Sequence, residues 1–337
     1  MAQSQLFALG SYTSLGGPGI RVFNLENGRM EPLYDTMIED PIWLELSADR
    51  QHLYAACGGE GPNEGFVASF GPKDGDYRRG LVPEARRGAH GVCPCHLCVA
   101  GGDLISANYA DGCISVFPLR DGVPGEMSQR IVHQGRGPHP ARQTRAHVHQ
   151  VLPLGENAFQ AQDLGTDTLT RYEKQDGRWV KTAVFPMPPG DGPRHALVSG
   201  DTMYLATELS SRLRVFRMAG GTLRELQDLP LPGPDHSGVN YPAALRLTPD
   251  RDELAVSCRG ADAAAFFRVA PDGTLQPDSW SPVHGCWPRD IVLLDRDTLL
   301  CACQKSGEVS LLRRVGSRLE VLDAMRVPAP VALLPLP

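Results

Sequence analysis

Short segments of alternating apolar and polar residues run along the whole chain, and one pattern among them recurs. The pattern is a proline, or a residue in its place, followed by a short apolar run. Its seven copies begin at residues 41, 94, 147, 193, 242, 288 and 330, so neighbouring copies start 42–53 residues apart. They read PIWLEL, PCHLCV, HVHQVLPL, PRHALV, PAALRL, PRDIVLL and PVALLPL. A repeat of this period that fills a chain is typical of β-propellers, in which each repeat forms one blade.

A second β-rich unit follows each copy of this pattern. Examples are LISANYADGCISVFPL at 104–119 and MYLATELSSRLRVFRM at 203–218, each with two alternating segments around a polar turn. Such a unit predicts a β-hairpin. Most hairpins lead into one more strand-like segment, as in GSRLEVLDA at 316–324, and sustained helical periodicity is absent. Each repeat therefore predicts a blade of four strands.

The two ends of the chain complement each other. The N-terminal segment starts directly with a hairpin unit, LFALGSYT at 6–13, and has no proline-led strand before it. The C-terminal segment ends on such a strand, PVALLPL at 330–336. We expect the last strand to complete the first blade, which leaves no unpaired sheet edge at the seam. The predicted fold is all-β, a single seven-bladed β-propeller over residues 1–337 whose ring is closed by the C-terminal strand.

Charge and hydropathy exclude several classes of partner. Lys and Arg total 33 against 39 Asp and Glu, a net charge of −6, which argues against binding nucleic acid or an anionic membrane. No apolar run approaches the roughly 18 residues of a transmembrane helix, and the first residues lack the basic start of a signal peptide. We expect a cytoplasmic protein that is a monomer or a weak homo-oligomer.

Nine cysteines raise the question of a metal site or disulfides. The densest group is VCPCHLC at 92–98, which places Cys93, Cys95, His96 and Cys98 close together. A structural zinc site normally needs a second pair of ligands, and no second C-x-x-C is present. We expect buried, reduced thiols, with zinc as the alternative.

The first strand of each propeller blade lines the central channel, so its polar residues are candidates for a ligand site. When the seven copies are superposed on their leading residues, one position can be compared across all of them. Two residues after the leading residue, the copies carry Trp43, His96, His149, His195, Ala244, Asp290 and Ala332. This alignment predicts three histidines at one level of the channel. One residue earlier in their copies stand Arg194 and Arg289. The hairpin tips add further polar candidates, namely Asn108, Asp163, Glu208, Arg259 and Gln304. The alternative is that these polar residues only bond neighbouring loops.

Two histidines stand two residues apart in the segment RAHVHQVLP at 145–153. In a strand, His147 and His149 would share one face and differ in depth by about 7 Å, two strand rises. We expect His149 inside the channel and His147 at the outer rim as a secondary contact.

Seven segments carry a resemblance to a known family: GSYT (10–13), PCHL (94–97), ANYADGCISVFPL (107–119), HVHQV (147–151), DLGTD (163–167), GPRH (192–195) and CRG (258–260). Through them essentially the whole chain resembles the lactonase family of seven-bladed β-propellers. The family contains the cycloisomerase-type 6-phosphogluconolactonases and the fungal carboxymuconate-lactonizing enzyme. Members often carry Asn before the Arg-Gly tip, where this chain has Cys258, which puts only the local hydrogen bonding of Arg259 in question.

The resemblance implies hydrolysis of a small anionic sugar lactone at the channel mouth, with 6-phosphogluconolactone giving 6-phosphogluconate as the expected reaction. It implies His149, Glu208, Arg194 and Arg259 as catalytic residues. Either His149 or Glu208 could be the base that deprotonates water, with the arginines holding the oxyanion or the substrate's negative charge. The residues expected to contact the substrate are His96, Asn108, His147, Asp163, His195, Arg289 and Gln304. No metal or organic cofactor is expected.

Three other functions stay open. One is a lactonizing cycloisomerase acting on a muconate-like acid. Another is a metal-dependent sugar lactonase with Glu208, Asn108 and Asp163 around a divalent ion. The third is a non-catalytic propeller that binds a ligand or a protein.

Overall fold

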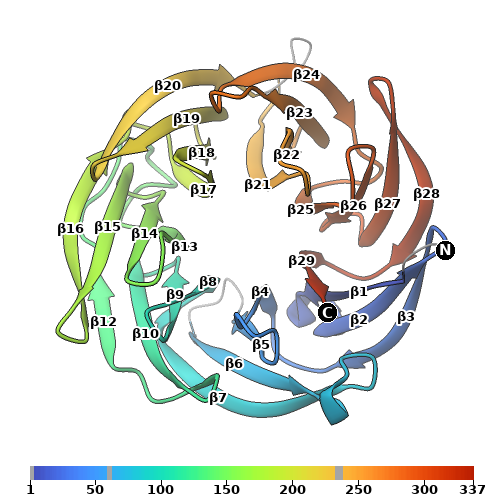
Figure 1. Ribbon diagram of the computed structural model, residues 1–337, viewed down its shortest axis with the longest axis horizontal. Coiled ribbons are helices and arrows are strands. Elements are labelled where there is room, and N and C mark those ends of the chain that lie inside the picture. Colours follow the sequence, from blue (N-terminus) through green and yellow to red (C-terminus); the bar gives the residue numbers. More distant parts are fainter. Residues whose placement is uncertain (1–3, 59–62, 232–237) are drawn as a thin grey trace.

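Seven antiparallel sheets lie around a central axis in the computed structural model, which describes residues 4–58, 63–231 and 238–337 (Figure 1). Each sheet runs outward from an innermost strand at the axis. The predicted all-β, seven-bladed propeller with four-stranded blades is confirmed. The innermost strands are β29 (Pro330–Leu336), β4 (Pro41–Leu46), β8 (Pro94–Ala100), β13 (Val148–Pro153), β17 (Pro193–Ser199), β21 (Tyr241–Leu247) and β25 (Pro288–Leu293).

The remaining strands form the hairpins and the outer rim. The second strands are β1 (Gln5–Ser11), β5 (Leu53–Cys57), β9 (Asp103–Asn108), β14 (Ala158–Asp163), β18 (Thr202–Thr207), β22 (Glu253–Arg259) and β26 (Thr298–Cys303). The third strands are β2 (Ile20–Glu26), β6 (Glu64–Pro72), β10 (Cys113–Arg120), β15 (Thr168–Gln175), β19 (Arg212–Ala219), β23 (Ala263–Val269) and β27 (Glu308–Val315). The outermost strands are β3 (Arg29–Thr36), β7 (Leu81–Val92), β16 (Arg178–Pro186), β20 (Thr222–Pro230), β24 (Leu275–Pro282) and β28 (Arg318–Arg326).

The third blade departs from this scheme at its outer edge. Two short strands, β11 (Val123–Pro124) and β12 (Gln129–Val132), both pair with β10 in place of one long strand. The loop 133–147 then leads to the next blade. Short 3₁₀ turns, η1 (Thr13–Leu15) and η2 (Lys73–Gly75), are the helical segments of the described chain, and none of its helices has the length and apolarity to cross a membrane.

The C-terminal strand closes the ring as predicted. β29 pairs antiparallel with β1, from Leu6 opposite Leu336 to Ser11 opposite Pro330. Figure 1 shows β29 at the inner edge of the blade that also contains the first three strands. The blade is therefore built from both ends of the chain, and every innermost strand has a hydrogen-bonded neighbour. Closure of this kind removes the sheet edge that would otherwise invite aggregation.

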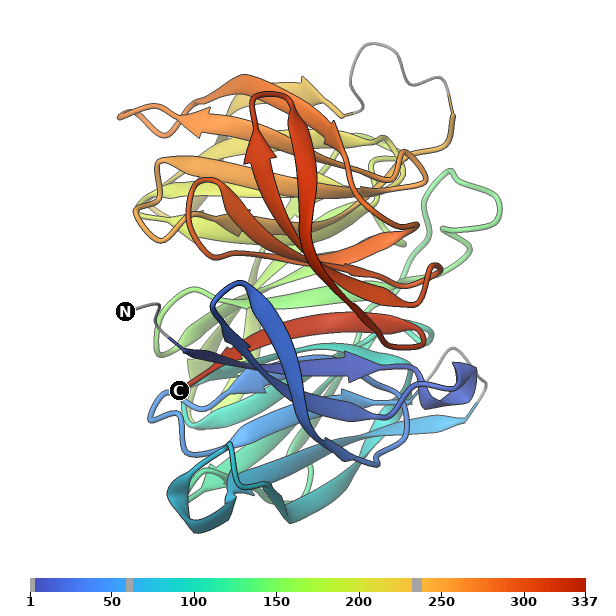
Figure 2. The same ribbon diagram turned by 90° about the vertical axis from the view of Figure 1, so that its right-hand side faces the viewer.

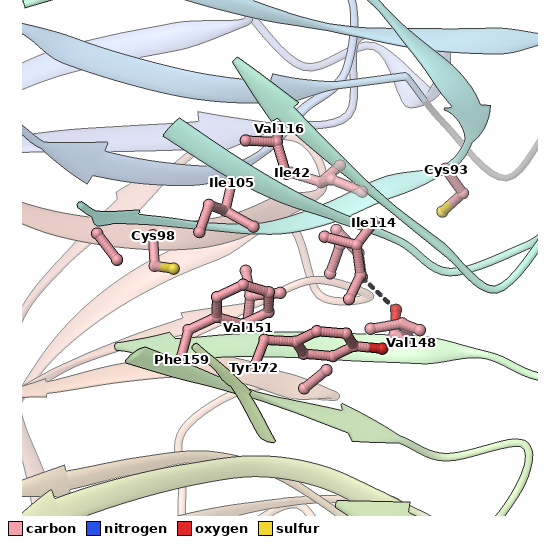
Figure 3. Packing of buried hydrophobic residues seen from close by; sticks show 14 of the residues in the cluster. Ile42, Cys93, Cys98, Ile105, Ile114, Val116, Val148, Val151, Phe159 and Tyr172 are labelled. Carbon is pink, nitrogen blue, oxygen red and sulfur yellow. Dashed lines mark hydrogen bonds between the residues drawn. The ribbon is translucent and has the colours of Figure 1, made fainter. Parts of the chain in front are cut away.

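Apolar side chains between neighbouring blades form the core. Between blades 3 and 4, for example, Ile105 and Ile114 lie against Val151 and Phe159, and all four are fully buried (Figure 3). Burying one such side chain contributes about 1.5–3 kcal/mol. All nine cysteines are free, and eight of them are buried, in keeping with the predicted thiols.

A β-bulge near the start of the innermost strands prepares the site. In β4, β8, β13, β17 and β25, the pairing with the second strand skips one residue directly after the leading residue. The skipped residues are Ile42, Cys95, His149, Arg194 and Arg289. A bulge leaves one residue unpaired and re-aims its side chain. The propeller thus presents a ring of redirected side chains at one end of its channel.

Candidate active site

A cavity of about 570 Å³ opens at the end of the channel where the innermost strands begin. We call it the mouth cavity. The loop 133–147 borders it, and Figure 2 shows this loop, in green, on the side of the propeller opposite the two termini. Its polar and charged lining consists of Tyr109, Arg142, His149, Glu208, Tyr241, Arg259, Arg289, Gln304 and Lys305.

The carboxylate of Glu208 is the centre of this site. Oε1 accepts a hydrogen bond from Arg142 Nη2 at 2.6 Å, and Oε2 accepts from Arg194 Nε at 3.0 Å and Arg259 Nη2 at 2.6 Å. Burial by itself would raise the pKa of Glu208, but the three positive charges outweigh it and hold that pKa well below its usual range. Glu208 is therefore a carboxylate at neutral pH that fixes three guanidinium groups, and it is a poor general base.

Local backbone geometry brings Glu208 and Arg194 together from neighbouring strands. Glu208 directly follows β18, and its backbone N–H donates to the carbonyl of Gly192 at 2.8 Å. Arg194 is the bulge residue of β17, so its side chain turns out of the ladder toward Glu208. Gly192 has a φ of +63°, and a Cβ there would lie 2.5 Å from Cγ of Leu209, so the turn into the strand requires glycine.

His149 lines the mouth cavity as the bulge residue of β13 and is 8 % exposed. Burial, together with the nearby charges of Arg194 and Arg259, lowers the pKa of His149 well below its usual value, although Glu208 opposes them. The ring is therefore neutral at physiological pH and able to accept a proton. Its Nδ1 has no hydrogen-bond partner within the described chain. A neutral imidazole in a cavity is the form that general-base catalysis requires.

Cations and aromatic rings alternate along one wall of the cavity. Lys305 Nζ lies 3.3 Å from the centre of the Trp287 ring, and the Arg259 guanidinium lies 5.6 Å from the same ring. The guanidinium of Arg259 is also 6.0 Å from the centre of the Tyr241 ring, and that of Arg142 is 5.8 Å from the same centre. The rings orient the cations through cation–π contacts.

Strand register corrects the sequence alignment of blade 4 by one residue. The alignment put His147 at the leading position of the innermost strand. In the structure, Val148 pairs with Asp163 there, in the way that Pro94 pairs with Asn108 in blade 3. Alternation of apolar residues does not reveal where a bulge inserts its extra residue, which is why the sequence alone gave the wrong alignment.

The three histidines consequently do not share one level of the channel. Gln150 takes the position equivalent to His96 and His195, and these three residues with Trp43 line a second cavity of about 360 Å³ further along the channel. We call it the far cavity. His149 faces the mouth cavity, although its ring centre is only 5.1 Å from that of His195. A layer of aromatic and imidazole rings therefore lies between the two cavities.

The predicted hairpin-tip residues do not occupy equivalent positions: Asn108 and Asp163 pair with the first residue of the innermost strand, whereas Glu208 lies one residue beyond that pair. Asn108 is fully buried at the end of β9 and donates to Ser115 Oγ at 2.9 Å. Asp163, at the end of β14, accepts from the backbone N–H groups of His147 at 2.8 Å and Gly165 at 2.9 Å. Neither residue lines the mouth cavity, so both stabilise turns where a substrate contact was expected.

His147 lies behind the cavity wall. Its Nδ1 is 2.8 Å from the carbonyl oxygen of Tyr109, and its ring stacks on the Tyr109 ring with centres 4.5 Å apart. Tyr109 itself lines the cavity. The structure thus places His147 as a support for Tyr109. The predicted contact residues Arg289 and Gln304 do line the cavity, and Arg289 Nη1 donates to Gln304 Oε1 at 3.2 Å.

Sequence reasoning missed five aromatic or cationic lining residues, for identifiable reasons. Tyr109 is the true equivalent of Glu208, one residue beyond the tip position assigned to blade 3. Tyr241 and Trp287 stand directly before the prolines of two repeat copies and could have been found by extending the alignment by one residue. Lys305 follows Gln304 in the same way. Arg142 belongs to the loop 133–147, which has no counterpart in other repeats and carries no such signal.

The donor set of the cavity suits an anion. Within the described residues, no group of three or more His, Cys, Asp or Glu side chains has the geometry of a metal site. The predicted metal set of Glu208, Asn108 and Asp163 does not converge, because two of its members are engaged in turns away from the cavity. The oxygens of Glu208 already accept from three guanidinium groups, whose charge repels a cation.

Comparisons with known proteins agree with this picture. Residues 6–335 match the family described as lactonase, 7-bladed beta-propeller. An uncharacterized protein of Staphylococcus epidermidis is 31 % identical over 317 residues, which cover 91 % of this chain and 92 % of that protein. Two solved structures are each 28 % identical to this chain. One is the periplasmic gluconolactonase PpgL of Pseudomonas aeruginosa, with a TM-score of 0.91 over 99 % of both chains. The other is a proposed 6-phosphogluconolactonase of Bacteroides fragilis, with a TM-score of 0.90 over 99 % of this chain and 98 % of that one.

The family match spans nearly the whole chain, and the similar structures cover the ring from end to end. Fold, site and sequence thus lead to one assignment. The chain belongs to the lactonase family of seven-bladed β-propellers.

Proposed function

We propose that the protein hydrolyses a small anionic sugar lactone in the mouth cavity, with 6-phosphogluconolactone as the substrate and 6-phosphogluconate as the product. The observation that carries the proposal is the neutral His149 beside an array of cations. Four cations line the cavity (Arg142, Arg259, Arg289 and Lys305), and Arg194 lies behind Glu208. In a chain of net charge −6, such a local excess of positive charge favours an anionic ligand.

In the proposed mechanism, His149 takes a proton from a water molecule as the water oxygen attacks the lactone carbonyl. The negative charge that develops on the carbonyl oxygen is stabilised by Arg259, whose guanidinium is fixed by Glu208. The ring C–O bond then breaks, and the leaving oxygen receives the proton from the imidazolium of His149. The product is a hydroxy acid, which loses its carboxyl proton at neutral pH.

Glu208 acts in this mechanism as a positioning residue. Its ion pairs hold Arg194 and Arg259 at fixed places, so the cationic groups need not reorganise as the oxyanion forms. The faces of Tyr241 and Trp287 can pack against the apolar face of a sugar ring. The names of the relatives from P. aeruginosa and B. fragilis support a sugar lactone as substrate.

A cytoplasmic location is part of the proposal. Nine free cysteines fit a reducing compartment. The similar protein from P. aeruginosa is named periplasmic. Fractionation of the cells that produce the protein would decide between these compartments.

The test of the proposed function is acid release from a panel of lactones, with and without a phosphate group, measured for the wild type and two histidine variants. His149→Ala should lower kcat by about 10²–10⁴, as expected for the loss of a general base, with an unchanged melting temperature. His147→Ala is the matched control, because the His147 side chain bonds to and stacks on Tyr109 outside the cavity and its loss should chiefly affect KM. Equal small losses in both variants would refute the role of His149.

A further inference from the structure

Arg142 differs from the other two arginines on Glu208 in its origin. It comes from the loop 133–147, which connects blades 3 and 4, and it reaches a carboxylate on blade 5. The main chain of this loop is anchored by the adjacent Gln143, which is fully buried. Gln143 Nε2 donates to Leu164 O at 2.8 Å and Asp167 Oδ1 at 2.7 Å. The loop therefore holds the base of the Arg142 side chain at a fixed point over the cavity.

The guanidinium of Arg142 retains unused donors. A single nitrogen, Nη2, makes both of its side-chain hydrogen bonds, to Glu208 Oε1 at 2.6 Å and to the Tyr109 hydroxyl at 3.1 Å. Its Nε and Nη1 groups have no protein acceptor within the described residues. The Arg142 side chain is 33 % exposed, against 3 % for Arg194 and 9 % for Arg259. Arg142 is thus the member of the cluster that is oriented by the protein and still open to a ligand.

We propose that Arg142 is the specificity-determining residue of the mouth cavity, and that it binds the non-reacting anionic group of the substrate, a phosphate or a carboxylate. This inference rests on the proposed function for its substrate, but it concerns a different step, the recognition of charge. Nη2 stays on Glu208 and Tyr109, while the two N–H groups of Nη1 are free to donate charge-assisted hydrogen bonds to the anion. Because Glu208 and Tyr109 fix Nη2, the plane of the guanidinium is fixed as well, and the free Nη1 donors have defined directions.

Lys305 is the competing candidate at the opposite end of the cavity wall. Its ammonium group is exposed and lies on the face of Trp287. A flexible ammonium at the rim attracts an anion from solution but does not fix its orientation. We therefore assign the steering of the anion to Lys305 and its recognition to Arg142.

The experiment compares kcat/KM for 6-phosphogluconolactone and for the uncharged glucono-δ-lactone. Arg142→Gln should lower the preference for the phosphorylated lactone about tenfold to a hundredfold, the range expected for loss of a charge-assisted pair. Arg142→Lys, which keeps the charge and loses the planar guanidinium with its oriented donors, should fall between the wild type and the glutamine variant. Arg145→Gln is the matched control, since it removes an exposed arginine from the same loop and should preserve the preference. A muconate-like lactone with a carboxylate serves as the second arm and tells whether the recognised anion is phosphate or carboxylate.

Calorimetry with inorganic phosphate gives a second readout that needs no turnover. Arg142→Gln should weaken phosphate binding by a similar factor, while Arg145→Gln should not. If both lactones lose rate equally in Arg142→Gln, the residue is only structural and the inference fails, whereas the proposed function stands. If Lys305→Gln abolishes the preference and Arg142→Gln does not, the anion site lies at the other end. If no lactone is hydrolysed, the proposed function fails and phosphate binding still decides the role of Arg142.

Discussion

Mild acid should destabilise this propeller steeply, because three histidines are buried in its channel. His96, His149 and His195 are 4–8 % exposed, and burial is the largest cause that lowers the pKa of each ring well below 6.5. In the unfolded chain these rings would titrate near their ordinary pKa of about 6.5. Below that pH the unfolded state binds protons that the folded state takes up only at a much lower pH, so the free energy of unfolding falls as pH falls.

The magnitude follows from the number of protons. Each histidine contributes up to about 1.4 kcal/mol per pH unit between its unfolded and folded pKa. Glu45, on the wall of the far cavity, acts in the opposite sense, because burial raises its pKa to about 7 and the folded state keeps a proton that the unfolded chain releases. For these four groups the folded and unfolded states differ by up to two protons, so that up to about 2.7 kcal/mol of the free energy of unfolding is lost per unit between pH 6 and pH 5.

Urea denaturation at half-unit steps from pH 7.5 to pH 5 measures this slope. His195→Gln should reduce it by about half, to one net proton, and glutamine already occupies the equivalent position in blade 4 as Gln150. Glu45→Gln should change it in the opposite direction, to about 4 kcal/mol per pH unit. His284→Gln, at an exposed position, is the control and should keep the wild-type slope. A wild-type slope below about 1 kcal/mol per pH unit, or identical slopes in all four proteins, would refute the reasoning.

Four further outcomes are expected. Glu208→Gln should lower the free energy of unfolding by about 3–5 kcal/mol, because it leaves three guanidinium groups around an uncharged amide. Added phosphate should raise the melting temperature of Glu208→Gln more than that of the control variant Glu253→Gln, which breaks the remote ion pair with Arg314. Equal increases in the two variants would argue against an anion site. Deletion of residues 330–337 removes the partner of β1 and should give insoluble or molten protein, so a soluble product with an unchanged melting transition would contradict ring closure. Acid release should be indifferent to EDTA, since Glu208 is already saturated by arginines, and a loss of activity restored by zinc or calcium would contradict a metal-free site.

The repeat pattern of the sequence determined the fold. Each proline-led apolar run became an innermost strand, from PIWLEL in β4 to PVALLPL in β29. Alternation and turn residues are local properties, so a blade can be read from about fifty consecutive residues. The missing first strand at one end and the extra strand at the other were enough to predict closure of the ring. The sequence also identified His149, Glu208, Arg259, Arg289 and Gln304, all of which line the mouth cavity.

Tertiary structure alone decided which polar residues share that cavity. A bulge shifts strand register by one residue, and since side chains alternate, this shift moves His149 to the mouth cavity and His96 to the far cavity. The bulge arises from pairing with a neighbouring strand, so the strand's own alternation does not encode it. Arg142 was beyond sequence reasoning for a related reason: its loop belongs to no repeat, and only the packed ring brings it to a carboxylate 66 residues further along the chain.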